Sequence, residues 1–299
     1  MAGSEYALEV QGLSKRFERF ELKDVSFRIP RGYIMGFAGR NGAGKTTTIK
    51  CILDLVKGDS GSIRIFGEDY ANNPIGIRDR IGYVSEDSPF YEDMTAAWTG
   101  RFVGKFYSRF DSRQFAGWLD RFQVDPGKKV KELSRGMKVK LSLALALSHH
   151  PELLILDEPT SGLDPVVRSE LLEVFLELLQ DENCTIFFSS HISSDMEKIA
   201  DYLTLIDNGR ILLSEEKHKL LDGWSIVKAD NRCKSPELDA LLCGKKEGDF
   251  GYSGIVQDGA EFRRRFAARF PGAEYRTDRL TLDELLVRLS GSQREELVC

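Results

Sequence analysis

A glycine-rich loop near the N-terminus constrains the fold more than any other stretch of this chain. Residues 39–46 fit the pattern GxxxxGK[ST] and lie between a predicted strand at Ile34–Ala38 and a predicted helix at Thr46–Leu55. In that context the pattern predicts a phosphate-binding loop. Its glycines let backbone N–H groups turn inward, and the helix presents its positive end. The loop is specific for a nucleoside triphosphate but not for a reaction.

Several side chains of the loop have distinct tasks in holding a triphosphate. Lys45 would bridge the β- and γ-phosphates as a point charge, Thr46 would ligate Mg²⁺ through its hydroxyl, and Thr47 would donate to the α-phosphate. The residues of this region expected to bind ATP are Gly39, Arg40, Asn41, Gly42, Ala43, Gly44, Lys45, Thr46 and Thr47.

Short apolar runs alternate with segments of helical period as far as about residue 213, which indicates an α/β domain with a mostly parallel sheet. With 299 residues, 41% of them hydrophobic, the chain is long enough for one large or two modest domains. Pro165 suits the first turn of a helix capped by Asp164, and Asn208-Gly209 predicts a hairpin. Beyond Ile34–Ala38, strands are predicted at Val25–Arg28, Ile63–Phe66, Ile81–Val84, Leu153–Leu156, Thr185–Ser189, Leu203–Ile206 and Ile211–Leu213. Beyond Thr46–Leu55, helices are predicted at Met137–Ser148, Pro165–Leu179 and Ser193–Ala200.

Residues 88–132 interrupt this alternation with aromatic side chains at near-helical spacing. The pattern predicts a helical insert, whose aromatic residues form either its core or an exposed docking face for another protein. Both interpretations can hold for different residues. The residues concerned are Trp98, Phe102, Phe106, Tyr107, Phe110, Phe115, Trp118 and Phe122.

The pattern changes again after Asp222-Gly223, which we interpret as a domain boundary. Capping-box spacing at Asp258/Glu261 and at Thr281/Glu284 predicts two helices in residues 224–299. The first of these helices would carry a phenylalanine stripe beside a basic face. It is interpreted as a surface helix, with contact to a membrane surface as the alternative.

Two carboxylates, Asp157 and Glu158, follow the apolar run Leu153–Leu156. Ligands gather at the carboxyl ends of parallel strands. Asp157 would hold the Mg²⁺ shell through water, and Glu158 would polarise the water that attacks the γ-phosphate. A polar loop after a strand gives the same pattern by itself, but the loop at Lys45 upstream favours the catalytic interpretation.

A second anion site is predicted where Leu133-Ser134-Arg135-Gly136-Met137 begins a helix. Ser134 can donate to a phosphate, and the helix N-terminus behind it attracts negative charge. Because the chain already has a phosphate site at Lys45, this second site suggests contact with the nucleotide of another subunit.

Taken in order, these motifs closely resemble the ATP-binding subunit of an ABC transporter over roughly residues 5–222. Residues 39–46 match Walker A, 133–137 the signature motif and 153–158 Walker B, while 161–164 resemble the D-loop. Within the family, residues 133–165 are similar to bacterial exporter-type ATPases, including the acetoin-utilisation and antibiotic-efflux branch. The segment TLDELLVRLSG at 281–291 is similar to the C-terminal segments of that branch.

The resemblance implies a P-loop NTPase fold of the ABC ATPase type. Its α/β core would have a mostly parallel sheet, an antiparallel β subdomain and a helical insert at about 88–150. The ATP-binding domain would span 1–222, and a small C-terminal α+β extension would span 223–299.

The resemblance also implies that two such domains close head to tail around two ATP molecules. Lys45, Glu158 and His191 would be catalytic, with His191 contacting the γ-phosphate and orienting Glu158. Ser134 and Gly136 would bind the partner's ATP, and Asp164 would report across the interface. Phe17 is the candidate to stack on adenine, with Phe20 as a rival and a core role open for either. The metal-binding residues implied are Thr46, Glu86 and Asp157.

The chain departs from the family's usual residues at four positions. Glu86 stands where Gln is usual and adds negative charge near the phosphates. Arg135 replaces the commonest Gly and Met137 the commonest Gln of the signature, while Arg40 replaces a frequent Pro. None of these changes removes a group that hydrolysis needs.

Charge and hydropathy limit the partners that are expected. The formal net charge is −5, which argues against a protein that coats nucleic acid. We find neither the roughly 18 to 20 consecutive apolar residues of a membrane span nor a secretory signal. Together with the family resemblance, these observations lead us to expect a subunit that powers a separate membrane permease, as an exporter, from the cytoplasmic face of the cell membrane. Its second ATP-binding subunit is either identical or different.

Two other functions are compatible with a phosphate-binding loop of this kind. The first is a soluble ABC-type ATPase acting on DNA or ribosomes. It is disfavoured because the chain has a single Lys45 loop, no heptad run and no CxxC pair. The second is a nucleotide sensor without turnover, and the presence of both Glu158 and His191 argues against it.

Overall fold

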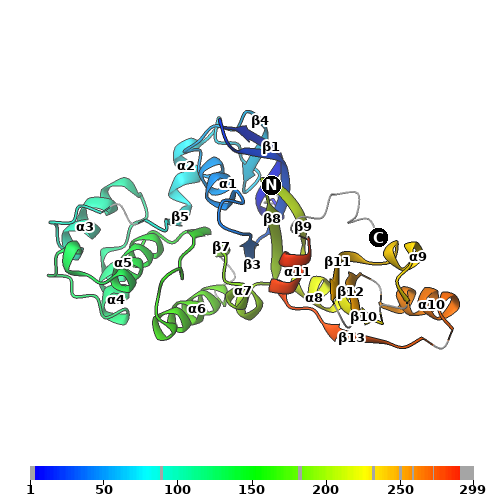
Figure 1. The fold of residues 1–299 in the computed structure, drawn as a ribbon. Coiled ribbons are helices and arrows are strands. Elements are labelled where there is room, and N and C mark those ends of the chain that lie inside the picture. Colours follow the sequence, from blue (N-terminus) through cyan, green and yellow to red (C-terminus); the bar gives the residue numbers. More distant parts are fainter. Residues whose placement is uncertain are drawn as a thin grey trace. The chain divides into compact units, whose positions relative to one another are not determined.

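The computed structural model describes residues 4–87, 90–180, 184–230, 233–248, 251–257, 259–271 and 273–289. The chain divides into two compact units, residues 1–211 and 212–299 (Figure 1). The predicted boundary at Asp222-Gly223 lies further along the chain and marks the end of helix α8 (Lys217–Gly223).

A sheet of six strands organises the first unit, as the alternation of apolar runs predicts. Its β3–β7, β3–β8, β5–β6 and β6–β7 pairs are parallel. Strands β8 and β9 are neighbours joined at Asn208-Gly209, both of which have positive φ (45° and 73°), so the predicted hairpin is confirmed. The strand order is β5 (Ile81–Val84), β6 (Leu153–Asp157), β7 (Thr185–Ser190), β3 (Ile34–Ala38), β8 (Tyr202–Asp207) and β9 (Arg210–Glu216).

An antiparallel sheet with the order β2–β1–β4 packs against the parallel one. Its strands are β1 (Tyr6–Arg16), β2 (Glu21–Pro30) and β4 (Ser60–Ile65). The rings of Phe27, Phe37 and Phe187, from β2, β3 and β7, lie 5.3–5.6 Å apart and join the two sheets. The antiparallel subdomain implied by the family resemblance is therefore present.

Helices α3, α4 and α5 form a cluster to one side of the sheet (Figure 1). Helix α5 is largely buried, and Phe115 and Phe122 are buried too, whereas Phe106 is 71% exposed. Phe115 and Phe122 therefore belong to the core of the insert, whereas Phe106 remains a candidate for the exposed docking face. The helices and short 3-10 turns of the first unit are α1 (Lys45–Ile52), α2 (Pro74–Asp79), α3 (Ala96–Val103), η1 (Gly104–Phe106), α4 (Ser112–Arg121), η2 (Val130–Glu132), α5 (Arg135–Leu147), α6 (Pro165–Leu179) and α7 (Ser193–Ile199).

The second unit is built on a four-stranded antiparallel sheet with the order β11–β12–β10–β13. Phe262 and Phe266 of α10 are buried with Val227 and Tyr252 of the sheet, so the predicted phenylalanine stripe faces the core. The elements are α8, β10 (Ser225–Ala229), α9 (Pro236–Asp239), β11 (Cys243–Gly248), β12 (Gly251–Val256), α10 (Gly259–Arg269), β13 (Tyr275–Arg279) and α11 (Leu282–Leu289).

Helix caps follow the sequence signals where the structure describes them. Asp164 accepts hydrogen bonds from the backbone N–H groups of Val166 and Val167 and so begins α6. Thr281 and Glu284 cap α11 reciprocally, each accepting from the other's backbone at 3.2 Å. Asp258, and residues 290–291 of the C-terminal segment, lie outside the described residues. No helix in the described part of the chain is both long and apolar enough to cross a bilayer.

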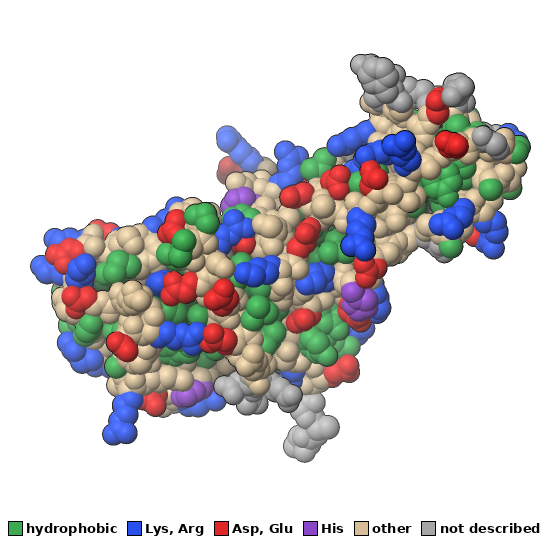
Figure 2. Space-filling view, turned by 90° about the horizontal axis from the view of Figure 1, so that it is seen from below, with side chains coloured by type: hydrophobic (Ala, Val, Ile, Leu, Met, Phe, Trp, Pro, Cys, Tyr) green, Lys and Arg blue, Asp and Glu red, His purple; other side chains and the backbone are tan. Residues whose placement is uncertain are grey.

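Acidic and basic side chains are interspersed over the face that Figure 2 shows. This mixture agrees with the small net charge and gives the surface in view no single sign.

Candidate functional site

The glycine-rich loop joins β3, whose five residues are all buried, to α1. Gly42 and Gly44 have φ of 80° and 114°, which L side chains rarely adopt. A Cβ on Gly39 would lie 2.5 Å from the Ile206 carbonyl oxygen, so only glycine fits there. These positions explain why the spacing of glycines defines the loop.

Lys45 is held inside the loop by backbone and carboxylate oxygens. Its Nζ donates to the Gly39 carbonyl at 2.7 Å and to the Arg40 carbonyl at 3.3 Å, and lies 3.0 Å from Glu158 Oε1. The side chains of Lys45 and Glu158 are 6% and 7% exposed. Burial of both charges is tolerable because each has the other as partner. The ammonium is thereby fixed at the N-terminus of α1.

Glu158 connects Lys45 to the predicted switch histidine. Its Oε2 lies 2.7 Å from His191 Nδ1 and accepts from the His191 backbone N–H at 3.4 Å. A neutral His191 must therefore carry its proton on Nδ1 to donate. Glu158 itself has a φ of 52°, an uncommon conformation for a residue other than glycine. The end of β6 thus places the Glu158 carboxylate within contact of both Lys45 and His191.

Ser189 on β7 links the Asp157 carboxylate to the backbone of Glu158, and sequence reasoning missed it. Its hydroxyl donates to Asp157 Oδ1 at 2.6 Å and accepts from the Glu158 backbone N–H at 3.0 Å. Asp157 is 2% exposed. Burial, with the Asp157 carboxylate as a second cause, raises the pKa of nearby Tyr83 to about 12. The only signal for Ser189 was its place at the end of the predicted strand Thr185–Ser189.

A cavity of about 690 Å³ opens at this edge of the sheet. It brings together most of the predicted loop residues with both catalytic candidates from other elements. Arg19, Phe20 and Ser161 also line it, and of these only Phe20 was a candidate. The predicted residues lining the cavity are Phe17, Asn41, Gly42, Gly44, Lys45, Thr46, Thr47, Glu86, Glu158 and His191. Gly39, Arg40, Ala43 and Asp157 are not among the lining residues.

Phe17 and Phe20 differ in how freely they can receive a base. Phe17 is 45% exposed, with Lys15 Nζ 5.8 Å from its ring centroid. Phe20 packs against the core, and its ring would meet a Cβ on Gly44 at 2.8 Å. The open ring of Phe17 therefore suits stacking better, while Phe20 supports the loop.

Ser134, Gly136 and Asp164 do not line the cavity at Lys45. Ser134 caps α5 by accepting from the Met137 backbone N–H at 3.3 Å, and Asp164 caps α6. Each of these two residues thus has a structural task within its own chain. Their contact with a partner's nucleotide remains a proposal.

Glu86 and Arg135, two of the departures from the usual family residues, are partners. Arg135 Nη2 lies 3.9 Å from Glu86 Oε1, and the two side chains are 55% and 48% exposed. The same guanidinium lies beside Gly162, where a Cβ would come within 2.9 Å of it. The basic residue of the signature motif thus offsets the extra acidic charge.

The donor set fits a magnesium ion bound mainly through its substrate. Mg²⁺ prefers oxygen ligands and keeps several waters, so it needs only one or two protein oxygens beside the phosphates. The Thr46 hydroxyl and the Glu86 carboxylate both line the cavity. Asp157, buried behind them, suits contact through water. In the described residues no cluster of three or more His, Cys, Asp or Glu side chains forms a metal cage.

A family model described as "ABC transporter" matches residues 22–161. The chain is 42% identical over 190 residues to a bacitracin transport ATP-binding protein of Bacillus licheniformis, covering 63% of this chain and 62% of that protein. The chain therefore spans less than two thirds of that relative's length.

Other relatives are covered more fully. A lantibiotic transport ATP-binding protein of Streptococcus pyogenes is 36% identical over 212 residues, 70% of this chain and 90% of that protein. A Nod factor export ATP-binding protein of Burkholderia lata is 30% identical over 303 residues, 97% of this chain and 98% of that protein. Among solved structures, an ATP-binding subunit of an ABC transporter is 31% identical with a TM-score of 0.67, covering 72% of this chain and 92% of that one.

Proposed function

The chain belongs to the ABC transporter family as an ATP-binding subunit, and on that premise we propose that it hydrolyses ATP to drive a separate membrane permease in export. The observation that carries the proposal is the single carboxylate of Glu158 held between Lys45 and His191 in the cavity formed by the glycine-rich loop. Relatives named for bacitracin transport, lantibiotic transport and Nod factor export favour transport over action on DNA or ribosomes.

In the proposed mechanism, each group that touches the triphosphate has one task. Lys45 and the loop N–H groups bind the β- and γ-phosphates, and Phe17 stacks on the base. Glu158 accepts a proton from the attacking water, and His191 holds the carboxylate in place. Mg²⁺, held by Thr46, Glu86 and water-linked Asp157, would neutralise charge on the phosphates.

We further propose that the ATP site is completed by a second ATP-binding subunit, identical or homologous. Ser134 and Gly136 of that subunit would contact the γ-phosphate from the N-terminus of its α5, a helix of 13 residues. Support comes from the position of these residues outside the cavity of their own chain. Asp164 would lie at the same interface.

The permease contact is proposed at the aromatic side of the helical cluster. Tyr91, Trp98, Phe102 and Phe106 form a chain of ring contacts with centroids 5.0–5.8 Å apart. Tyr91 and Phe106 are 60% and 71% exposed. An exposed aromatic group of this kind suits an apolar partner segment. Such a contact would hold the subunit at the cytoplasmic face of the membrane.

Replacement of Glu158 by Gln tests the hydrolytic role. The variant keeps the side chain's shape but removes the proton acceptor, so steady-state phosphate release should fall about 10²- to 10⁴-fold. ATP binding should persist, and an ATP-bound dimer should accumulate in size-exclusion chromatography. Glu173→Gln, an exposed substitution on α6, is the matched control and should release phosphate at the normal rate. Normal release by Glu158→Gln would show that another residue directs the water.

A further inference from the structure

Basic side chains line up across the sheet of the second unit. Lys246 is directly opposite Ser253, Ser253 opposite Lys228, and Lys228 opposite Arg276. Residues opposite each other on neighbouring strands point to the same face of the sheet. The four residues therefore form one row across all four strands, which we call the basic row.

A fourth basic side chain reaches the row from α11. Arg288 Nη2 lies 3.4 Å from Ser253 Oγ, and its Nη1 donates to the Gly244 carbonyl at 2.9 Å. A Cβ on Gly244 would clash with the Arg288 backbone, so α11 lies close against β11 there. Ser253, the one uncharged member of the row, is thus surrounded by cations.

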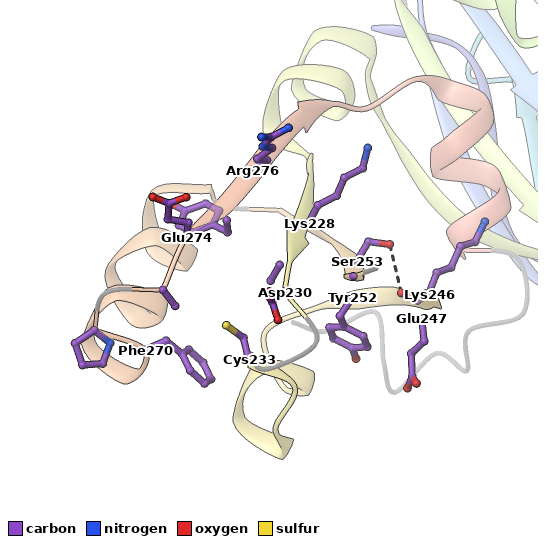
Figure 3. A pocket seen from close by; sticks show the side chains of 15 residues that line it. Lys228, Asp230, Cys233, Lys246, Glu247, Tyr252, Ser253, Phe270, Glu274 and Arg276 are labelled. Atoms are coloured by element: carbon purple, nitrogen blue, oxygen red, sulfur yellow. Dashed lines mark hydrogen bonds between the residues drawn. The ribbon is translucent and has the colours of Figure 1, made fainter. Parts of the chain in front are cut away.

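Carboxylates neutralise this group only in part. Lys228 pairs with Asp278 at 2.5 Å. Within the described residues, neither Lys246 nor Arg276 has an ion-pair partner within 4 Å, and both are exposed. Glu247 pairs with Lys234, and in Figure 3 it points away from the row, as Asp230 does. Glu274 also lines the cavity beside the row, together with Asp230 and Glu247. The positive charge is therefore local to Lys246 and Arg276, the two cations of the row without an ion-pair partner among the described residues.

The row is unfavourable for the fold by itself. Lys228 and Arg276 are like charges directly opposite one another, an arrangement that destabilises a sheet. On the other face of the same sheet, Tyr252 and Tyr275 pack into the core with Phe266. Core packing therefore does not require basic side chains in the row, and an anionic ligand would relieve their repulsion.

The row borders a concave surface, which continues around the end of the sheet to Tyr252 and Tyr275 on the other face. Lys228, Lys246, Ser253 and Arg276 all line one cavity of about 1200 Å³ at the end of the sheet (Figure 3). In that view the three basic side chains extend to the same side of the sheet. Gly251 lies next along this face and offers no side chain to cover them. A ligand can therefore reach several cations at once.

We propose that the basic row binds an anionic ligand that carries at least two phosphate groups. Neighbouring strands are about 4.8 Å apart, so Arg276 lies one spacing from Lys228 and about 14 Å from Lys246 along the row. A ligand with two phosphate groups can place one between Arg276 and Lys228 and turn the other toward the long side chain of Lys246. A guanidinium such as that of Arg276 binds phosphate oxygens in a fork, and Lys228 and Lys246 add point charges. The ligand is either a soluble phosphate compound or a lipid headgroup with the same chemistry. This site is independent of the ATP site.

Calorimetric titration of the full chain with inorganic pyrophosphate tests the proposal. Arg276→Gln should weaken one class of pyrophosphate site about tenfold, which corresponds to about 1.4 kcal/mol. Arg279→Gln is the matched control, because Arg279 is an exposed residue of the same strand whose partner Ser225 places it on the opposite face. Pyrophosphate binding at the ATP site is common to all variants and cancels in the comparison.

Lys246→Gln provides a second, independent variant on a different strand, and it should also weaken pyrophosphate binding severalfold. Two results together would overturn the proposal. The wild type, Arg276→Gln and Arg279→Gln would bind pyrophosphate with equal affinity, and vesicle binding would not depend on Arg276.

Vesicle co-sedimentation separates the two sources of ligand. Vesicles containing anionic phospholipid that retain the wild type and Arg279→Gln but lose Arg276→Gln would identify a lipid headgroup. Pyrophosphate binding that depends on Arg276, without such vesicle binding, would identify a soluble phosphate compound. Vesicles of neutral phospholipid should retain none of the three proteins.

Discussion

Lys45 in the first unit and the basic row in the second place positive charge in contrasting ways. Lys45 is 6% exposed and has a carboxylate and two carbonyls around it. Lys246 and Arg276 are exposed, and Arg276 lies directly opposite Lys228. A buried charge must be paired to be tolerated at all, whereas an exposed one can remain without a partner because water solvates it. Removing a cation should therefore have opposite effects on stability in the two regions.

The largest effect is expected for Lys45→Ala. Loss of the Lys45 ammonium leaves Glu158 buried with His191 as its remaining side-chain partner. The free energy of unfolding of the first unit should therefore fall by about 3 kcal/mol. ATP binding should also weaken by roughly 1.5 to 3 kcal/mol, the worth of a charge-assisted contact. Chemical denaturation and nucleotide titration measure the two effects.

Lys50→Ala is the control for this comparison, because Lys50 lies on the same helix but is exposed. It should change the free energy of unfolding and ATP binding little. If Lys45→Ala were as stable as Lys50→Ala, burial would not be what distinguishes the two kinds of cation.

A smaller effect of opposite sign is expected for Arg276→Gln. Removing one of two like charges on neighbouring strands should raise the free energy of unfolding of the second unit by about 0.2 to 1 kcal/mol. Thermal unfolding at low ionic strength measures the gain, which added salt should reduce. If Arg276→Gln instead lowered the free energy of unfolding in the absence of ligand, Arg276 would stabilise the fold.

The smallest effect is expected for the exposed pair of Glu86 and Arg135. Their coupling energy in a double-mutant cycle with Glu86→Gln and Arg135→Gly should be about 0.2 to 1 kcal/mol, because solvent screens charges that are half exposed. Denaturation of the wild type, both single variants and the double variant yields this energy. A coupling energy above about 2 kcal/mol would show that solvent exposure does not weaken the interaction between Glu86 and Arg135.

The two charged regions also differ in how far sequence predicts them. The residues around Lys45 are consecutive, and their spacing alone indicates a phosphate site. Lys228, Lys246 and Arg276 are far apart in the chain, and only the register of three strand pairs brings them together. Strand register depends on tertiary pairing, so no local pattern marks this row.

The fold itself was largely predictable, with informative exceptions. Strand β3 and helix α6 have the predicted bounds, because a continuous apolar run and a Pro-led helix give strong local signals. Strand β1, which was not predicted, is partly polar and has register shifts against both neighbours, so its alternation is irregular. The contact of Glu158 with His191 was expected only from the family resemblance, since the two residues are on different strand ends.

The packed rings of Phe27, Phe37 and Phe187 have a mechanical consequence. Because Phe37 is on the strand that leads directly into the glycine-rich loop, that loop is anchored to both sheets through tightly packed aromatic surfaces. The two sheets should therefore move as one rigid block when nucleotide binds. Any pivoting during the ATPase cycle would then fall to segments outside this block.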